Sequence, residues 1–496
     1  MVEFSTPMPN AGSLPNNAFA VKPAIVLALA ALADWLFYGQ RIGVSAVGFA
    51  ITLACGALLA NFARLNKTQV LLAGALVLAA LVPAIEEFNA ASFFFIVLAL
   101  GVGLSLTTGP KLTGAGEQAA ALCDLYLVGP FRLLRDAISA FSLPALTAGF
   151  TTWFIPVVLT SMFGFLFVSA NPLLEKWISL MNPGSATSFI SAGRILFWVL
   201  ALSIVWPFIH VRWRRRSEVT ADLAVAETET KDKQERTVDF LGAATILRSL
   251  ILFNLLFAVQ TALDVFFLWG NATLPADISY AAYAHRGAYP LILTALLAAG
   301  FVLVTMRPGG PAEQSNVIRP LVYLWVAQNV LLVASSILRL DLYVQIYLLT
   351  WWRIAAFIWM LLVALGLLLI VARIRLNRSN EWLIRANLVT LTATLYVCSL
   401  VNFTAIIADY NVDHSREVSG NGFTVDINYL FQLGPQALPA INRAIALRGS
   451  DPNLVSRRDC LVEQHRSDLA SWRAWGFRSW RLQRALEAQQ KRSTVS

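Results

Sequence analysis

The sequence predicts an all-α fold: a polytopic transmembrane helix bundle of about eleven spans with a helical extramembrane C-terminal tail. Of the 496 residues, 57% are hydrophobic and only 14% are charged, whereas a soluble chain carries roughly 25% charged residues. Apolar runs of about 20 residues, the length that crosses a bilayer, recur along the chain. Short arginine-containing loops separate many of these runs, as is typical of multi-pass membrane proteins.

Three regions follow one another along the chain. Residues 1–17 are polar and contain three prolines, which predicts a disordered leader. Residues 18–408 hold the expected bundle, and residues 409–496 the soluble helical tail. The expected spans are Lys22–Tyr38, Gly43–Phe62, Gln69–Ile85, Ala90–Leu106, Leu146–Val168, Ile190–Val211, Ala243–Leu268, Tyr289–Met306, Val317–Ser336, Trp351–Ala372 and Leu383–Ala408.

The distribution of lysine and arginine predicts the orientation. Positive residues collect in short cytoplasmic loops of bacterial membrane proteins. The loops that we assign to the cytoplasm contain Arg64, Lys67, Lys111, Arg132, Arg135, Arg212, Arg214, Arg215, Arg216, Arg307, Arg319, Arg373, Arg375, Arg378 and Arg385. We therefore expect an inner-membrane protein with a cytoplasmic N-terminus and a tail on the outer side.

Two segments between spans have a different character. Residues 114–143 mix leucine and phenylalanine with charged residues, which predicts an interfacial cytoplasmic helix, broken at Gly129-Pro130. Residues 212–239 mix charges of both signs and predict a solvated linker.

The sequence lacks the common signatures of enzymes and metal sites. Its four histidines form no H-E-x-x-H pair and its four cysteines no C-x-x-C pair, so we expect no metal and no cofactor. There is no Walker-type loop. The net charge of +9 lies largely in short loops, so it indicates membrane orientation and not nucleic-acid binding.

Polar residues within and beside the apolar spans form the candidate site. Ionisable groups in hydrocarbon usually face a bundle interior or a wet cavity, where they pair. Asp264 lies near the outer end of its span and could meet Arg286 or Arg339. A charged cluster at the outer face, or alternatively a structural girdle of ion pairs, would contain His285, Arg286, Asp264, Asp34, Arg339, Asp341 and Asp409.

The tail carries a second pattern, in which aromatic residues alternate with arginine. The helix expected at Asp459–Glu487 contains Trp472, Trp475 and Trp480 among several arginines. Such a helix docks on lipid headgroups or on the bundle. The alternative is a helix that packs on its own domain with solvated arginines.

Five strings resemble a known family of bacterial polytopic membrane proteins. They are LADWLFYG (Leu32–Gly39), TILRSLILFNLLFAVQTALDVFFLWG (Thr245–Gly270), YAHRGAYPLILTALLAAGFVL (Tyr283–Leu303), SSILRLDLYVQIYLLTWWRIAAFIWMLLVALGL (Ser335–Leu367) and WRAWGFRSWRLQRAL (Trp472–Leu486). The family they resemble is domain of unknown function 4173, which is related to group 4153. The resemblance implies an integral inner-membrane protein of undefined activity and transfers no catalytic residue.

Three classes of function remain open at this point. The first, which is not enzymatic, is a transport-type or envelope protein with a polar outer-leaflet site for a small molecule. The second is a membrane-embedded transferase that acts on a lipid-linked substrate, with Asp34 as its acid. The third is a sensor or assembly scaffold that uses the tail. Membrane lipids are the partners that all three share.

Overall fold

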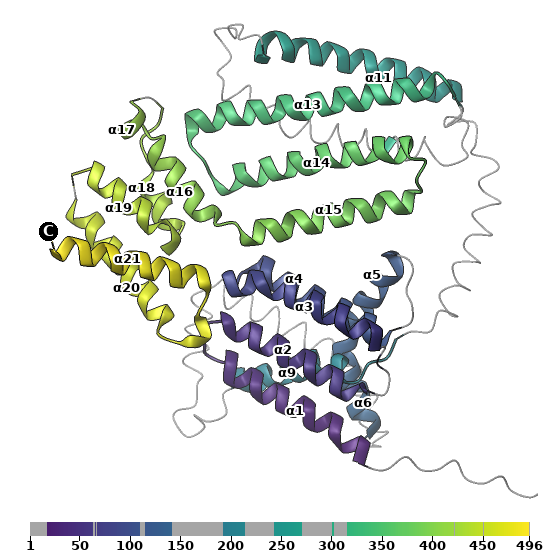
Figure 1. The fold of residues 1–496 in the computed structure, drawn as a ribbon, viewed down its shortest axis with the longest axis vertical. Coiled ribbons are helices and arrows are strands. Elements are labelled where there is room, and N and C mark those ends of the chain that lie inside the picture. The colour runs from purple at the N-terminus through teal and green to yellow at the C-terminus, as the bar shows by residue number, and fades with distance from the viewer. Residues whose placement is uncertain are drawn as a thin grey trace, which may run out of the picture. The chain divides into compact units, whose positions relative to one another are not determined.

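A computed structural model describes residues 17–62, 65, 67–109, 115–140, 192–213, 243–269, 300–301, 315–420, 422–449 and 451–495. These residues form helices and no strand (Figure 1). The chain divides into two compact units. Unit 1 comprises Met1–Arg214 and Ser471–Phe477, and unit 2 comprises Arg215–Ala470 and Arg478–Ser496.

Unit 1 is built around five long helices. They are α1 (Asn17–Phe37), α2 (Val44–Ala60), α3 (Lys67–Glu86), α4 (Ala90–Thr108) and α9 (Ala192–Ile209). A capping box at Asn89 and Ser92 starts α4 directly after α3. Small and branched apolar residues fill the core, while residues such as Leu71, which is 83% exposed, cover the outside. Helices that are apolar on all faces suit a lipid surrounding.

A shorter helical arm in unit 1 corrects the prediction of a break at Gly129-Pro130. It runs through α5 (Ala115–Cys123), a π-helical turn η2 (Asp124–Val128) and α6 (Gly129–Ala140) without a gap. The Gly129 N–H donates to the Asp124 carbonyl, five residues back. Pro130 has no N–H and would disturb a regular α-helix, and the wider π turn just before it keeps the arm helical. A Cβ at Gly129 would lie 2.7 Å from Pro207 Cγ, so glycine permits close packing on α9.

Ser471–Phe477 belongs to unit 1, although the chain on both sides of it belongs to unit 2. It contains the short 3-10 helix η6 (Trp472–Ala474), which covers the turn between α1 and α2. The Val44 N–H donates to the Trp475 carbonyl at 2.8 Å. The Arg473 guanidinium lies over the rings of Trp35 and Trp472, at 4.6 and 5.5 Å from their centroids. This part of the tail therefore docks on the bundle, as one of the sequence-based alternatives proposed.

Unit 2 contains four long helices that pack on one another in chain order (Figure 1). They are α11 (Ala243–Asp264), which continues as a π turn η4 (Val265–Trp269), α13 (Ile318–Tyr347), α14 (Trp351–Arg375) and α15 (Asn380–Leu400). Trp325 lies at the centre of their core, against Phe253, Phe257 and Phe301.

The tail domain, which we define as α16 to α20, begins earlier than expected. Its helices are α16 (Phe403–Asp413), α17 (Arg416–Ser419), α18 (Ile427–Gln432), η5 (Pro435–Ala437), α19 (Leu438–Leu447) and α20 (Pro452–Leu469), followed by α21 (Phe477–Val495). The last span, expected at Leu383–Ala408, ends at Leu400. The Asn402 side chain accepts from the Ala405 N–H and starts α16, whose Ala408 and Val412 join the tail-domain core.

The described helices support a multi-pass membrane protein. Six of them are long and apolar enough to cross a bilayer: α3, α4, α11, α13, α14 and α15; α2 and α9 are shorter apolar helices. The expected spans Leu146–Val168 and Tyr289–Met306, apart from residues 300–301, lie outside the described residues. So do the leader, except Asn17, and nearly all of the linker.

Candidate functional site

A buried ion pair joins α11 to α13 in unit 2. The Arg339 guanidinium donates through Nη2 to Asp264 Oδ1, and the two side chains are 6% and 2% exposed. Gln260 Nε2 donates to the same oxygen at 2.9 Å. The other oxygen, Asp264 Oδ2, is buried and accepts no hydrogen bond from the described residues. Of the two partners predicted for Asp264, the structure shows Arg339.

The ion pair lies at one end of a polar track between these helices. Apolar residues cover most of α13, but five of the twelve buried residues of this 30-residue helix are polar. The track consists of the buried residues Asn254, Asp264, Gln328, Asn329, Ser335, Ser336 and Arg339. Buried polar side chains in a membrane bundle usually connect helices or line a path for a solute or ion.

Hydrogen bonds along the track connect α11 and its π turn to α13. Asn254 Nδ2 donates to the Leu321 carbonyl at 3.1 Å, and Gln328 Nε2 donates to the Asn254 carbonyl at 3.2 Å. Nearer the ion pair, Trp269 Nε1 donates to Ser335 Oγ at 3.3 Å. These contacts fix the rotation of the two helices, so that Asp264 and Arg339 face each other.

The track also presents oxygens that the described residues leave without hydrogen bonds. They are the side-chain oxygens Asn254 Oδ1, Asp264 Oδ2, Gln328 Oε1 and Asn329 Oδ1, all buried. A buried polar atom without a partner costs free energy, more so in a medium without water. Each of these oxygens can accept a hydrogen bond from water or from an N–H or O–H group of a solute.

Two other candidate residues of unit 2, Asp341 and Asp409, bond to side chains outside the ion pair. Asp341 accepts from Gln345 at 2.8 Å, and Asp409 accepts from Arg443 Nη2 at 2.6 Å. Burial raises the pKa of the Asp409 carboxyl above its ordinary value, with Asp413 adding to the rise and Arg443 opposing it. His285 and Arg286 lie outside the described residues.

Asp34 belongs to unit 1, where it pairs with a residue that the sequence analysis missed. The Arg194 guanidinium of α9 forks onto both carboxylate oxygens, with Nε 3.0 Å from Oδ1 and Nη2 bonded to Oδ2. It also lies 5.4 Å from the ring centroid of Tyr38. Arg194 stands near the start of its span and Asp34 near the end of the first, which places them at similar depth. A comparison of charges by depth could have found the pair.

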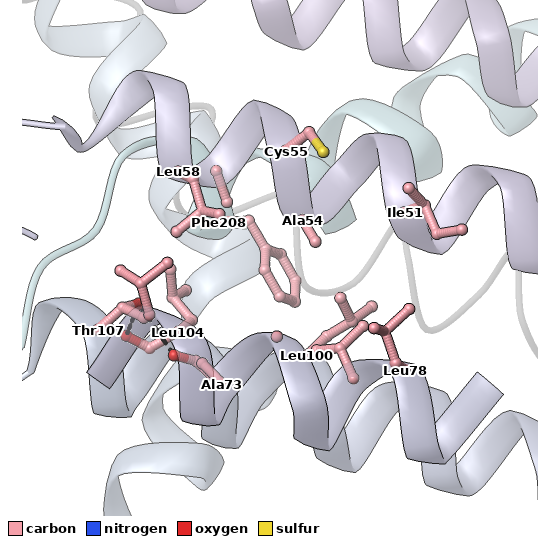
Figure 2. A pocket seen from close by; sticks show the side chains of 15 residues that line it. Ile51, Ala54, Cys55, Leu58, Ala73, Leu78, Leu100, Leu104, Thr107 and Phe208 are labelled. Atoms are coloured by element: carbon pink, nitrogen blue, oxygen red, sulfur yellow. Dashed lines mark hydrogen bonds between the residues drawn. The ribbon is translucent and has the colours of Figure 1, made fainter. Parts of the chain in front are cut away.

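Unit 1 contains a separate cavity whose lining is almost entirely apolar. Its volume is about 190 Å³, and it lies between α2, α3 and α4 with Phe208 at one wall (Figure 2). The hydroxyl of Thr107 donates to the Gly103 carbonyl at 2.9 Å and is thereby satisfied within its own helix. The Cys55 thiol also borders the space. Since apolar side chains form nearly all of its wall, the cavity suits a hydrocarbon chain and not a polar reactant.

The helices and the buried ion pair define an all-α, multi-pass membrane protein with charged groups inside the bundle. The chain belongs to the family described as Domain of unknown function (DUF4153), which it matches over residues 24–444. This match confirms the resemblance of the sequence to domain of unknown function 4173 and the related group 4153. No curated protein and no solved structure matches the chain.

Proposed function

We propose that this protein is a transport-type protein of the bacterial inner membrane, in which the polar track of unit 2 binds a polar solute. The observation that carries the proposal is the buried Asp264–Arg339 pair with its unbonded oxygen Oδ2. A buried ion pair contributes little net stability compared with apolar packing, because its desolvation offsets the attraction. Ionisable groups inside a membrane bundle are typical of substrate and proton pathways.

The chemistry of the pair suggests how it works. Arg339 remains charged, since arginine does not lose its proton in proteins, and its buried charge requires an anion. Asp264 supplies that anion while it is ionised. When Asp264 takes up a proton at Oδ2, the Arg339 fork becomes available to a carboxylate or phosphate of a solute. We therefore propose that proton binding and the binding of a small anionic solute are coupled at this pair.

The proposed orientation places the tail domain outside the cell and the N-terminus in the cytoplasm. It is supported by Arg373, Arg375 and Arg378 at the end of α14, the end remote from the α13–α14 loop that the tail domain contacts. Positive residues of this kind favour the cytoplasmic side. The ion pair lies toward the tail-domain end of α13, so the solute would reach it from outside.

The transferase alternative has less support, because both oxygens of Asp34 are bonded to Arg194. A catalytic acid needs an oxygen that can reach the substrate. For the sensor or scaffold alternative, the one specific observation is that Ser471–Phe477 belongs to unit 1, which gives this part of the tail a role within the protein itself.

Proton uptake by proteoliposomes tests the proposed function. The full chain is reconstituted around a trapped pH-sensitive dye, and the outer buffer, which contains inorganic phosphate as the anionic probe, is acidified. We expect faster acidification than in protein-free vesicles, and loss of the excess rate in Asp264→Asn. Asp264→Glu, which keeps the carboxyl group, should retain part of it. The matched control is Asp341→Asn, since Asp341 is an exposed acid near the same end of α13. Uptake that equals the protein-free rate, or that persists in Asp264→Asn, would overturn the proposal.

A further inference from the structure

A basic groove in unit 1 carries an inference that does not depend on the polar track. It lies where the helical arm α5–α6 meets the residues that follow α9, and its volume is about 340 Å³. Its lining residues are Asp124, Val128, Phe131, Arg132, Arg135, Arg212 and Trp213. The arm is amphipathic, and the arginine distribution assigns this end of unit 1 to the cytoplasmic membrane surface.

Two of the three arginines are fixed in place by contacts within the groove. Arg132 Nη2 lies 2.5 Å from Asp124 Oδ2, and its Nη1 donates to the Arg212 carbonyl at 2.7 Å. Arg212 Nη1 donates to Asp136 Oδ1 at 2.9 Å, and Asp136 also accepts from Trp206 Nε1 at 3.0 Å. These contacts hold two guanidinium groups at fixed positions, and the two aspartates balance their charges.

The third arginine provides the positive charge that the two aspartates do not balance. Arg135 is exposed and lines the groove, and its side chain makes no hydrogen bond or ion pair with the described residues. Directly after Trp213 the sequence continues with Arg214, Arg215 and Arg216. The groove thus carries an excess positive charge and adjoins a cluster of further arginines in the sequence.

The same groove offers an apolar surface beside the charge. Val128 and Phe131 are 46% and 51% exposed, although they are large apolar residues on a helix surface. Trp213 adds an indole, which donates through Nε1 to Thr108 Oγ1 at 3.2 Å. Tryptophan beside exposed apolar residues is typical of the membrane interface. A ligand that fits both features carries an anionic group at one end and hydrocarbon at the other.

We infer that this groove binds the phosphate headgroup of an anionic phospholipid, with Arg135 as the residue that contacts the phosphate. Basic pockets on the cytoplasmic side of helix bundles recognise anionic headgroups in this way. The guanidinium fork matches two phosphate oxygens. The hydrocarbon chains of the lipid would lie along Val128 and Phe131, on the outer surface of the arm.

Retention of lipids by the purified full chain tests this inference. The protein is equilibrated with equal amounts of phosphatidylglycerol and phosphatidylcholine, and the bound lipids are counted by native mass spectrometry. We expect preferential retention of phosphatidylglycerol, and a decrease of roughly fivefold in Arg135→Ala, the effect of one surface cation. Arg135→Lys should retain part of the binding, because the charge remains but the planar fork is lost.

The matched control is Arg378→Ala, which removes an exposed arginine of the α14–α15 turn that does not line the basic groove. It should leave the retention unchanged. A folding check by circular dichroism accompanies each variant. Equal retention of both lipids by the wild type, or unchanged retention in Arg135→Ala, would overturn the inference. Displacement of phosphatidylglycerol by inorganic phosphate at low concentration would identify free phosphate as the ligand and overturn the assignment to a lipid.

Discussion

Asn411 pairs both ends of its side-chain amide with the backbone of Leu349. The Leu349 N–H donates to Asn411 Oδ1 at 2.6 Å, and Asn411 Nδ2 donates to the Leu349 carbonyl at 2.9 Å. Leu349 lies in the loop between α13 and α14, beside Leu348, whose φ of 64° is unusual for a branched residue. The Arg353 guanidinium donates to the carbonyls of Tyr347 and Leu348. The tail domain therefore holds this loop in a backbone conformation that it would not readily adopt alone.

Asn411→Ala should destabilise unit 2. The substitution leaves the buried N–H and C=O of Leu349 without their partner, at a cost of about 1–3 kcal/mol for each buried group. Thermal unfolding of the full chain in detergent measures the effect as a lower midpoint temperature. Asn453→Ala, at an exposed position of the tail domain, is the control and should stay within about 0.5 kcal/mol of wild type. Equal midpoints for the two variants would contradict the role of Asn411.

The ion pair of the polar track should show strong coupling in a double-mutant cycle. Asp264→Asn or Arg339→Gln alone leaves one buried charge without its partner, which costs about 3–5 kcal/mol. The double variant removes both charges and should lose clearly less than the sum of the single losses. The readouts are unfolding in detergent and the amount of protein in the membrane. Additive losses would show that the two side chains do not interact in the membrane-embedded protein.

His465 should make the stability of the tail region depend on pH. Burial lowers the pKa of its imidazole below the ordinary value of 6.5, although Ser479 and Asp468 oppose this shift. The folded state thus prefers the neutral ring, and its contribution is complete above the unfolded pKa. Stability is lost as the pH falls from 6.5 toward the lower folded-state pKa. Midpoint temperatures between about pH 8 and about pH 5 measure this loss, which His465→Gln should reduce. His414→Gln, at an exposed histidine, is the control. If it reduced the pH-dependent loss of stability as much as His465→Gln, the effect would not come from His465.

The turn between α1 and α2 should lie on the same membrane face as Ser471–Phe477, because the Val44 N–H bonds to the Trp475 carbonyl. In a background without native cysteine, Gln40→Cys and Ala470→Cys should both react with a membrane-impermeant maleimide added to intact spheroplasts. Arg378→Cys should react only after permeabilisation. A reporter fused after Arg375 should report the cytoplasm, and a reporter fused after Ser450 should report the outside. Labelling of Gln40→Cys and Ala470→Cys from opposite faces would contradict the docked segment.

The sequence was sufficient to locate most of the described helices. Uninterrupted apolar runs such as Trp351–Ala372 correspond closely to observed helices, here α14, because such runs have no other stable form in a bilayer. The end of the last span was wrong because apolar residues continue past Asn402 into α16. The cap at Asn402 is visible in the sequence, but the residues around it are as apolar as a span. Hydropathy cannot separate a core helix of the tail domain from the last turns of a membrane helix.

The candidate site was harder to predict than the helices. An aspartate in an apolar span requires a partner, which is why Arg339 was a candidate for Asp264, but the choice between two arginines needed the packing of α13 on α11. The five buried polar residues of α13 include no charged residue except Arg339, so charge alone did not reveal the track. Arg194 was missed because its partner Asp34 lies in a distant span. Contacts of this kind depend on which spans become neighbours, which single-span patterns do not encode.

The docking of Ser471–Phe477 has a consequence for biogenesis. Helices are made in the order of the sequence, so α1 and α2 are synthesised long before the residues that cover their turn. Until then the Val44 N–H lacks the Trp475 carbonyl, and the Trp35 ring lacks the Arg473 guanidinium. The first helices of the chain thus reach their final packing only after translation has passed the tail. A nonsense mutation late in the gene would accordingly leave the turn between α1 and α2 without these contacts.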